Sequence, residues 1–290
     1  MARLSVVYYT RPPLMDHSLT VVRALSEYAD VHMMLELAPD DRDSGLFDEA
    51  SIDVPSGVIP ARPVLEAGYL AGARQFTSQL ASFDLVVYSS SRVISTNTPL
   101  VTLAAATRVL ALRPDVIHFE DISNRSMPML FLPGQPKVLS IHDPGTHVGE
   151  RSRRSDRVRQ FYLQRARFYL LLFNRHAEQL YFSQFPRRPF SLIALPALDV
   201  FREWPGPPVP EQPHTVLFFG RIKPYKGLDV LFTCLPETAQ RVPGLRVIVA
   251  GLPEGGYEPP VPPDLPPGSL VTYYEPVSYT HLTLPTILRV

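Results

Sequence analysis

The sequence has only one cysteine, Cys234, among its 290 residues. One thiol cannot form an intrachain disulfide or a cysteine-based zinc site, and it fits a reducing compartment. No run of about 18 apolar residues is available to cross a membrane as a helix. The first residues, MARLSVVYYTRPP, hold too short an apolar run for a signal peptide and indicate a first strand. These absences predict a cytoplasmic protein.

An excess of charge of either sign is absent as well. Lysine and arginine number 28, aspartate and glutamate number 28, and the formal net charge is zero. A neutral chain gives no global argument for a nucleic-acid partner, and we expect none. Apolar residues make up 45% of the chain, which is enough to form one large core or two ordinary ones.

Short apolar strands alternate with longer helical patterns through the first 200 residues. Such alternation is typical of a parallel sheet covered by helices on both faces, so we predict a doubly wound α/β domain over residues 1–200. Residues 39–60 break the rhythm and are interpreted as a surface excursion. The predicted strands are Leu4–Tyr9, Val31–Leu35, Leu85–Tyr88, Val116–Phe119, Val138–Ile141, Leu180–Phe182 and Leu192–Ala194, and the predicted helices lie near His17–Tyr28, Val64–Ser82, Leu100–Leu112 and Arg154–Phe173.

A second α/β region follows a proline-rich stretch. Residues 201–214, with PGPPVPEQP at Pro205–Pro213, are poor in apolar residues and read as a stiff linker. A strand–helix–strand unit then begins within residues 215–276, and another proline-rich loop leads to a further strand. Its predicted elements are Val216–Phe219, Gly227–Gln240, Leu245–Ala250 and Ser269–Tyr274. The two halves therefore share one architecture.

The segment FFGRIKPYKG, Phe218–Gly227, leaves the first strand of this region and enters its helix. Ligands of open α/β sheets bind outside the carboxyl ends of the strands, and helix N-termini favour phosphate. Gly220 makes the turn, and Arg221 and Lys226 place two cations at that edge. This arrangement suits a diphosphate, which gains charge as it departs. The alternative is a solvated basic turn that only caps a helix.

With its continuation GLDVLF, this segment resembles the start of the C-terminal domain of glycosyltransferase family 4 enzymes, which have the GT-B fold. LRVIVAGLPE resembles the next strand and turn of that family. The resemblance implies two Rossmann-like domains and a metal-independent, retaining enzyme with no cofactor. It also implies that Arg221 and Lys226 hold the diphosphate of a UDP-, GDP- or ADP-sugar. The acceptor would be a glycan, a lipid-linked molecule or a small molecule.

The segment KVLSIHDPGTHVG, Lys137–Gly149, carries a second resemblance, to the family's His-Asp turn after a central strand. In those enzymes the histidine contacts the sugar or the acceptor, which implies such a role for His142 beside Asp143. His147 follows in the same loop. A histidine at the carboxyl edge of a parallel sheet is well placed for polar chemistry, but a purely structural hydrogen bond is the alternative.

Other polar residues are expected at the same edge of the sheet. Glu120 and Asp121 follow a strand, where they could orient an acceptor hydroxyl, act as a base or cap the next helix. Arg11, Asp16 and His17 follow the first strand in place of the glycine-rich loop of many family members, and they are candidates for the acceptor side. For Asp16, capping of a helix is the alternative.

A basic segment lies between these regions. Residues Arg151–Arg175 include eight arginines and one acid, Asp156, interleaved with FYLLLF. A basic amphipathic helix could touch an anionic membrane at its inner face or meet a lipid-linked acceptor. The alternative is a solvated helix whose apolar side chains pack on the sheet.

The last residues do not continue the family pattern. VSYTHLTLPT, Val277–Thr286, resembles the translation of a sequencing-library adaptor, so we interpret residues 277–290 as a non-native tail and the C-terminal domain as truncated. The family's later glutamate pair, which grips the donor, does not follow Gly251. We therefore expect retaining glycosyl transfer, but not from the chain as written. The alternatives are a GT-B-fold epimerase or phosphorylase, or a non-catalytic sugar-nucleotide-binding relative.

Overall fold

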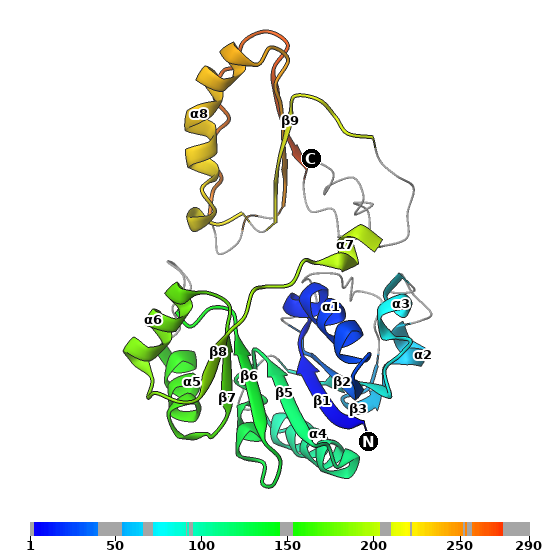
Figure 1. Cartoon of the computed structure of the whole chain (residues 1–290). Coiled ribbons are helices and arrows are strands. Elements are labelled where there is room, and N and C mark those ends of the chain that lie inside the picture. Colours follow the sequence, from blue (N-terminus) through cyan, green and yellow to red (C-terminus); the bar gives the residue numbers. More distant parts are fainter. Residues whose placement is uncertain are drawn as a thin grey trace. The chain divides into compact units, whose positions relative to one another are not determined.

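The computed structural model describes residues 3–39, 54–65, 72–90, 92, 95–145, 153–203, 210–220, 222–251, 253 and 257–274. These residues form two compact units, one made of the described residues up to 203 and one of those from 210 onward (Figure 1). None of the described helices is long and apolar enough to cross a membrane. Each unit is an α/β layer structure built on its own sheet.

The first unit contains an eight-stranded sheet in the order β3-β4-β2-β1-β5-β6-β7-β8. All neighbouring strands pair in parallel except β3, which runs antiparallel to β4. The strands are β1 (Leu4–Thr10), β2 (Ala29–Leu37), β3 (Gly57–Pro60), β4 (Ser82–Val87), β5 (Val116–Glu120), β6 (Lys137–Ile141), β7 (Tyr169–Leu172) and β8 (Phe190–Leu192). The predicted parallel, doubly wound sheet is confirmed.

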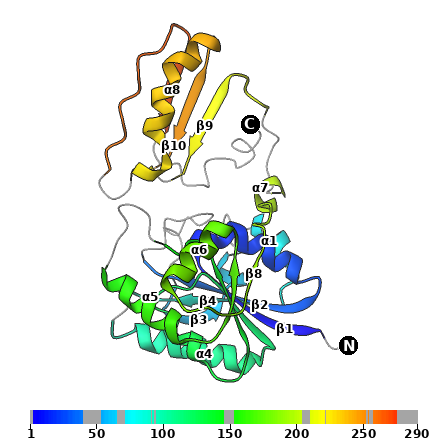
Figure 2. The same cartoon turned by 60° about the vertical axis from the view of Figure 1, so that its left-hand side comes forward.

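Helices cover both faces of this sheet (Figure 2). On one face α1 packs on β1 and β2 and contacts α3 and α7, whereas α4 packs with η4, a 3-10 helix, and η4 contacts α5. Tyr9 and Phe119 belong to one apolar core with Val101 and Val109 of α4. The helical segments are η1 (Pro12–Leu14), α1 (Met15–Leu25), α2 (Arg62–Leu65), α3 (Arg74–Thr77), α4 (Thr98–Leu112), η4 (Met127–Phe131), α5 (Arg153–Arg165), α6 (Arg175–Gln184) and α7 (Asp199–Glu203).

Two sequence-based assignments after residue 150 are wrong. Leu180–Phe182, predicted as a strand, lies inside α6, which the side chain of Asn174 caps by accepting a 2.7 Å hydrogen bond from the amide of Ala177. The helix predicted to reach Phe173 ends at Arg165, and β7 follows between β6 and β8. Short apolar runs fit a strand or a buried helix equally well, so sheet pairing decides their conformation.

Two further differences occur between β2 and β4. The predicted surface excursion contains β3, an antiparallel edge strand next to β4. Val64–Ser82, predicted as one helix, contains the end of α2 and the whole of α3, while residues 66–71 lie outside the described part. Short antiparallel edge strands carry little apolar periodicity, so the sequence pattern did not reveal β3.

The second unit has a parallel three-stranded sheet in the order β11-β10-β9, packed against one long helix. Gly251, just after β10, approaches the backbone so closely that an added Cβ would lie 1.8 Å from the carbonyl oxygen of Gly220. The elements are β9 (Thr215–Phe219), η5 (Pro224–Lys226), α8 (Leu228–Arg241), β10 (Arg246–Ala250) and β11 (Leu270–Tyr274). The predicted strand–helix–strand unit and following strand are confirmed.

Candidate functional site

The topology of the first sheet singles out the carboxyl ends of β1 and β5. From β1 the chain moves outward to β2, reaches the edge strand β3, pairs next to it as β4, and then returns through α4 to β5 on the other side of β1. Open α/β sheets bind ligands outside the carboxyl ends of their strands at such a reversal. Arg11 follows β1 here, Glu120 ends β5, and His142 follows β6.

Glu120 is the centre of a polar cluster at this edge, and its side chain is 1% exposed. Its Oε1 lies 2.5 Å from Nε2 of His142 and 3.3 Å from Nε2 of His17. Its Oε2 accepts a 2.8 Å hydrogen bond from the hydroxyl of Tyr8 and lies 3.3 Å from Nε2 of His118. These five residues, Tyr8, His17, His118, Glu120 and His142, are called the Glu120 cluster below.

Four different elements hold the cluster in place. Tyr8 comes from β1, His17 from the first turn of α1, Glu120 and His118 from β5, and His142 directly follows β6. The rings of His17 and His142 meet edge to face, with centroids 4.9 Å apart. Phe173 packs against His142, with ring centroids 4.5 Å apart, and forms an apolar wall beside the two imidazoles.

The electrostatics of the cluster favour an ionised carboxylate. Burial alone would raise the pKa of Glu120, but hydrogen bonds from His118, His142 and His17 outweigh it and hold that pKa well below its usual range. Burial opposes the charged form of His142, yet the hydrogen bond and charge of Glu120 raise the pKa of His142 above its ordinary value. Proton-transfer chemistry at the sheet edge needs this kind of coupled acid and base.

Asp121, next to Glu120, has a different environment. Its Oδ2 lies 3.1 Å from Nη2 of Arg11, and its Oδ1 lies 3.8 Å from Nη2 of Arg159. Its backbone adopts φ +44°, a left-handed conformation that is uncommon for residues other than glycine and that recurs at functional sites. Arg11 and Asp121 thus form an ion pair across the ends of β1 and β5.

Asp16 and Asp143 stand at the margin of the cluster. Asp16 lies in the first turn of α1, where its Oδ1 accepts a 2.7 Å hydrogen bond from the amide of His17, and burial raises its pKa. The residue before the helix is Leu14, so Asp16 is not the N-cap. The backbone oxygen of Asp143 accepts a 3.3 Å hydrogen bond from Arg159.

The sequence patterns pointed separately to His17, Glu120 and His142, and the structure brings all three into contact. The sequence patterns did not point to Tyr8 or to His118, the other two members of the Glu120 cluster. The signal for His118 was present, because alternate residues of a strand share a face and His118 precedes Glu120 by two positions. Tyr8 gave no such signal, since its partner Glu120 is 112 positions away.

The predicted diphosphate site lies in the second unit and is only partly described. Gly220 follows β9 with φ +107°, a conformation that favours glycine. Lys226 ends η5 directly before Gly227, the N-cap of α8, and its Nζ lies 5.2 Å from the ring centroid of Tyr225. Arg221 and His147 lie outside the described residues, as does the predicted tail, residues 277–290.

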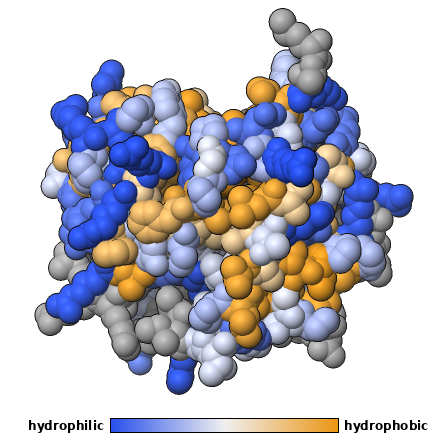
Figure 3. Space-filling model, turned by 90° about the horizontal axis from the view of Figure 1, so that it is seen from below, coloured by the Kyte–Doolittle hydropathy of each residue, from blue (hydrophilic) through white to orange (hydrophobic). Residues whose placement is uncertain are grey.

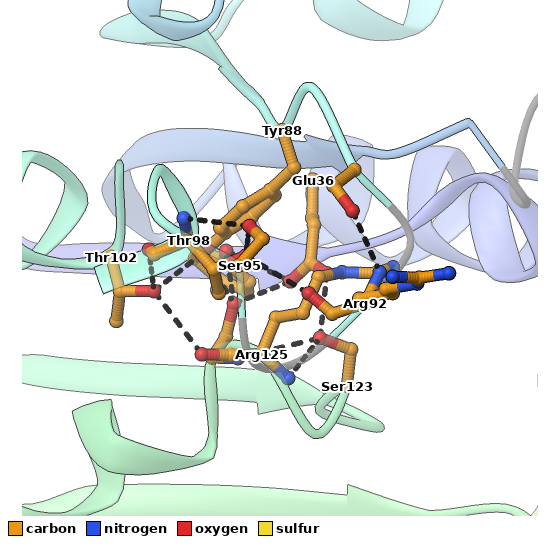
Figure 4. Close-up of polar contacts among 11 residues, drawn as sticks. Glu36, Tyr88, Arg92, Ser95, Thr98, Thr102, Ser123 and Arg125 are labelled. Carbon is orange, nitrogen blue, oxygen red and sulfur yellow. Dashed lines mark hydrogen bonds and ion pairs between the residues drawn. The ribbon is translucent and has the colours of Figure 1, made fainter. Parts of the chain in front are cut away.

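A second buried carboxylate, Glu36, organises polar residues on the opposite face of the sheet (Figure 4). Its Oε1 lies 3.0 Å from Nε of Arg125 and accepts a 2.6 Å hydrogen bond from the hydroxyl of Ser123. Its Oε2 accepts hydrogen bonds from the hydroxyls of Ser126 and Tyr9 at 2.5 and 3.0 Å. Every one of these groups is buried, so we interpret this network as structural.

Beside this network lies a cavity of about 420 Å³ that is partly open to solvent and is lined by residues of α4, η4 and α5. Its lining is mostly apolar, and Leu103 and Tyr162 lie on its sides. Apolar side chains are exposed around it on Leu100, Leu103, Phe131 and Phe161. Figure 3, seen from below, shows hydrophobic patches between hydrophilic residues on this unit. Within the segment Arg151–Arg175, Leu163 and Ala166 are buried, which matches the interpretation of a helix packed on the sheet.

Comparison with known proteins gives a fold and no family. No family model and no curated protein sequence match the chain. A solved structure described as a UDP-N-acetylglucosamine 2-epimerase from Listeria monocytogenes is 9% identical, with a TM-score of 0.57 over 98% of this chain and 72% of that one. MnaA of S. aureus in complex with UDP is 7% identical, with a TM-score of 0.53 over 96% and 70%.

HepE of Anabaena, solved in complex with UDP and glucose, is 12% identical, with a TM-score of 0.52 over 88% of this chain and 62% of that one. At these identities the likeness shows the fold alone. The chain has the α/β architecture of the GT-B type, as the sequence predicted.

Proposed function

We propose that the chain comes from a sugar-nucleotide-processing enzyme that moves a sugar from a UDP-, GDP- or ADP-sugar to an acceptor hydroxyl with retention of configuration. One observation carries the proposal: a buried carboxylate with three imidazoles at the reversal point of a GT-B-type sheet. The similar structures named above include proteins solved with UDP, or with UDP and glucose, which agrees with a nucleotide-sugar ligand. No metal or cofactor is part of this proposal.

On the donor side, Arg221 and Lys226 would bind the diphosphate. Lys226 directly precedes Gly227, the N-cap of α8, and the free amide groups of that helix end add positive potential nearby. The leaving diphosphate gains charge in the transition state, so these cations would act more strongly there than on the bound donor.

On the acceptor side, the Glu120 cluster would handle the proton. The acceptor hydroxyl must lose a proton as its oxygen bonds to the sugar, and His142 is the most exposed of the three histidines around Glu120. Glu120 would orient the ring of His142 and stabilise its charged form. The Arg11–Asp121 ion pair at the same edge would recognise sugar or acceptor hydroxyls.

A second candidate function is epimerisation of a sugar nucleotide. Epimerases remove and return a proton on carbon, which requires more acids and histidines than transfer does. The gathering of His17, His118 and His142 around Glu120 favours this alternative. A non-catalytic relative that only binds a sugar nucleotide is the third candidate.

The test measures binding first and turnover second. Binding of UDP, GDP, ADP and their glucose or N-acetylglucosamine conjugates to the 290-residue chain is followed by calorimetry. Turnover is followed with the reading frame recovered from neighbouring genomic sequence, because the tail is interpreted as non-native. Release of free nucleotide diphosphate with a new glycosidic bond supports transfer.

The same reaction run in D₂O separates the candidates. Deuterium on a ring carbon of the recovered sugar nucleotide supports epimerisation, because only that reaction breaks a carbon–hydrogen bond. Binding without turnover, in either solvent, supports the non-catalytic relative. Absence of binding to all three nucleotides, with the chain folded, would overturn the whole proposal.

A membrane contact is a separate proposal about partners. Exposed Phe161 and Arg157 on α5 lie on the same helix, and Phe131 of η4 packs on Tyr162 with ring centroids 5.4 Å apart. Apolar and basic groups together suit the inner face of an anionic membrane that carries a lipid-linked acceptor. Co-sedimentation with phosphatidylglycerol vesicles but not with phosphatidylcholine vesicles is expected, and equal recovery with both would contradict it.

A further inference from the structure

We propose that His17, Glu120 and His142 form a binding site for one divalent transition metal ion of the zinc class. One ring nitrogen of each imidazole and a carboxylate oxygen of Glu120 all lie within 4.8 Å of one another. Two imidazoles and one carboxylate are ligands that Zn²⁺ accepts, and three protein ligands leave a fourth position open for water or substrate. The inference does not rest on the proposed function, and it excludes one role in it: with the ion bound, Nε2 of His142 is a ligand and cannot take the acceptor's proton.

The distances decide how far the cluster must move to receive the ion. Tetrahedral Zn²⁺ with nitrogen and oxygen ligands at about 2.1 Å separates its ligand atoms by about 3.4 Å. His17 and Glu120 already have this spacing, at 3.3 Å. His142 is hydrogen-bonded to Glu120 at 2.5 Å and would have to draw back by roughly 0.9 Å. Since His142 follows β6 in a bend and is 18% exposed, it is the ligand best able to move.

The surroundings of Glu120 support a ligand role. Metal-bound carboxylates are themselves held by hydrogen bonds from outside the site. The second oxygen of Glu120 accepts the hydroxyl of Tyr8 and faces His118. His118 is in turn 2.7 Å from the hydroxyl of Ser140. Oε2 of Glu120 is thus held by Tyr8 and His118, while Oε1 faces the imidazoles of His17 and His142.

The charge balance also favours a cation. The carboxylates of Asp16, Asp121 and Asp143 interact electrostatically with the histidines of the site, in addition to Glu120. Arg11 and Arg159 are the cations paired with Asp121. A divalent ion at Glu120 would lie among these carboxylates, and negative groups around a buried cation offset part of the cost of removing it from water.

The site departs from the sequence-based expectation of a metal-free enzyme. That expectation concerned the donor diphosphate, for which Arg221 and Lys226 replace a cation. An ion at Glu120 would lie instead at the reversal point of the first sheet. The chemistry that it could supply there is polarisation of a bound oxygen or of a water molecule.

The experiment uses Co²⁺ as a visible probe and Zn²⁺ as a competitor, with the 290-residue chain after treatment with a chelator. We expect one equivalent of Co²⁺ to bind with the absorption of tetrahedral cobalt and to be displaced by Zn²⁺. His17→Ala and His142→Ala should each weaken binding by more than about a hundredfold, and Tyr8→Phe by about tenfold. Thermal unfolding without metal checks that each variant is folded.

Two variants serve as matched controls. His176→Ala removes an exposed histidine on α6, and Cys234→Ser removes the only thiol. Both should bind Co²⁺ as tightly as the wild-type chain. Weak binding of several equivalents, loss of binding in either control, or unchanged binding in His142→Ala would each overturn the proposal. If His17→Ala fails to fold, the partly exposed His142→Ala still decides it.

Discussion

Tyr8 and Tyr9 are neighbours in β1, but their hydroxyls bind two different buried carboxylates. Tyr8 donates to Glu120 at 2.8 Å, and Tyr9 donates to Glu36 at 3.0 Å. Successive residues of a strand point to opposite faces of its sheet, so one dipeptide reaches two separate polar networks. The first network belongs to the candidate site and the second to the core beneath α4.

This relationship allows a matched test with the smallest possible change. Tyr8→Phe and Tyr9→Phe each remove one buried hydroxyl, and each should lower the free energy of unfolding by about 1–3 kcal/mol. Only Tyr8→Phe should also reduce turnover, because only Tyr8 contacts the Glu120 cluster. Urea unfolding and steady-state kinetics on both variants make the comparison. Equal turnover in the two variants would remove Tyr8 from the site.

The Glu36 network should matter for stability rather than for activity. Glu36→Gln keeps the shape of the side chain but leaves the buried guanidinium of Arg125 without its carboxylate, so the free energy of unfolding should fall by about 3–5 kcal/mol. The control is Glu237→Gln, which breaks an exposed ion pair with Arg241 and should change stability by less than about 1 kcal/mol. Chemical denaturation measures the free energy of unfolding of both variants. Similar losses of stability in Glu36→Gln and Glu237→Gln would show that burial of the ion pair does not govern its contribution.

The donor turn can be tested by charge removal. Arg221→Ala and Lys226→Ala should each weaken donor binding and turnover by about ten- to a hundredfold or more, equivalent to about 1.5–3 kcal/mol. Arg246→Ala is the control, because Arg246 begins β10 and therefore lies at the opposite edge of the same sheet. Isothermal calorimetry with UDP and GDP measures the effect. Unchanged affinity in both turn variants would reduce the segment to a solvated helix cap.

Gly251 should tolerate no side chain. A Cβ at this position would lie 1.8 Å from the carbonyl oxygen of Gly220, so Gly251→Ala should destabilise the second unit by about 3 kcal/mol or more. Gly268→Ala is the control, because a Cβ there meets nothing within 4 Å, although its φ of +88° adds some strain. Hydrogen exchange of β9 and β10 reports the loss, and equal protection in the two variants would contradict the prediction.

The sequence predicted most of the architecture because its elements are strongly patterned. The strands around β1 are near-continuous apolar runs, and the second unit follows its predicted elements closely. Prediction failed where pairing rather than pattern decides the structure. Tyr169–Leu172 and Leu180–Phe182 are both short apolar runs, yet the first pairs as β7 and the second lies in α6.

The sequence could predict which residues lie at the carboxyl edge of the first sheet, but it could not predict that they contact one another in the Glu120 cluster. Glu120 and His142 were recognisable because each follows a predicted strand, although Glu120 is the last residue of β5 in the structure. Their contact depends on β5 and β6 being neighbours in register, with Glu120 opposite Ser140, which the sequence pattern does not specify. The role of Tyr8 depends on a partner that is distant in sequence. The roles of Arg221 and His147 stay predictions, since both residues lie outside the described part of the chain.

The central place of β1 has a consequence for synthesis on the ribosome. β1 is made before every other strand of its sheet, yet one of its two edges pairs only with β5, whose residues follow β1 by more than a hundred positions. At about 5–20 residues per second, that edge waits roughly 5–20 seconds for its partner. During this interval Tyr8 and Arg11 have neither Glu120 nor Asp121 to bind. The nascent chain must therefore keep an apolar strand edge from pairing with other chains until the last parts of the site emerge.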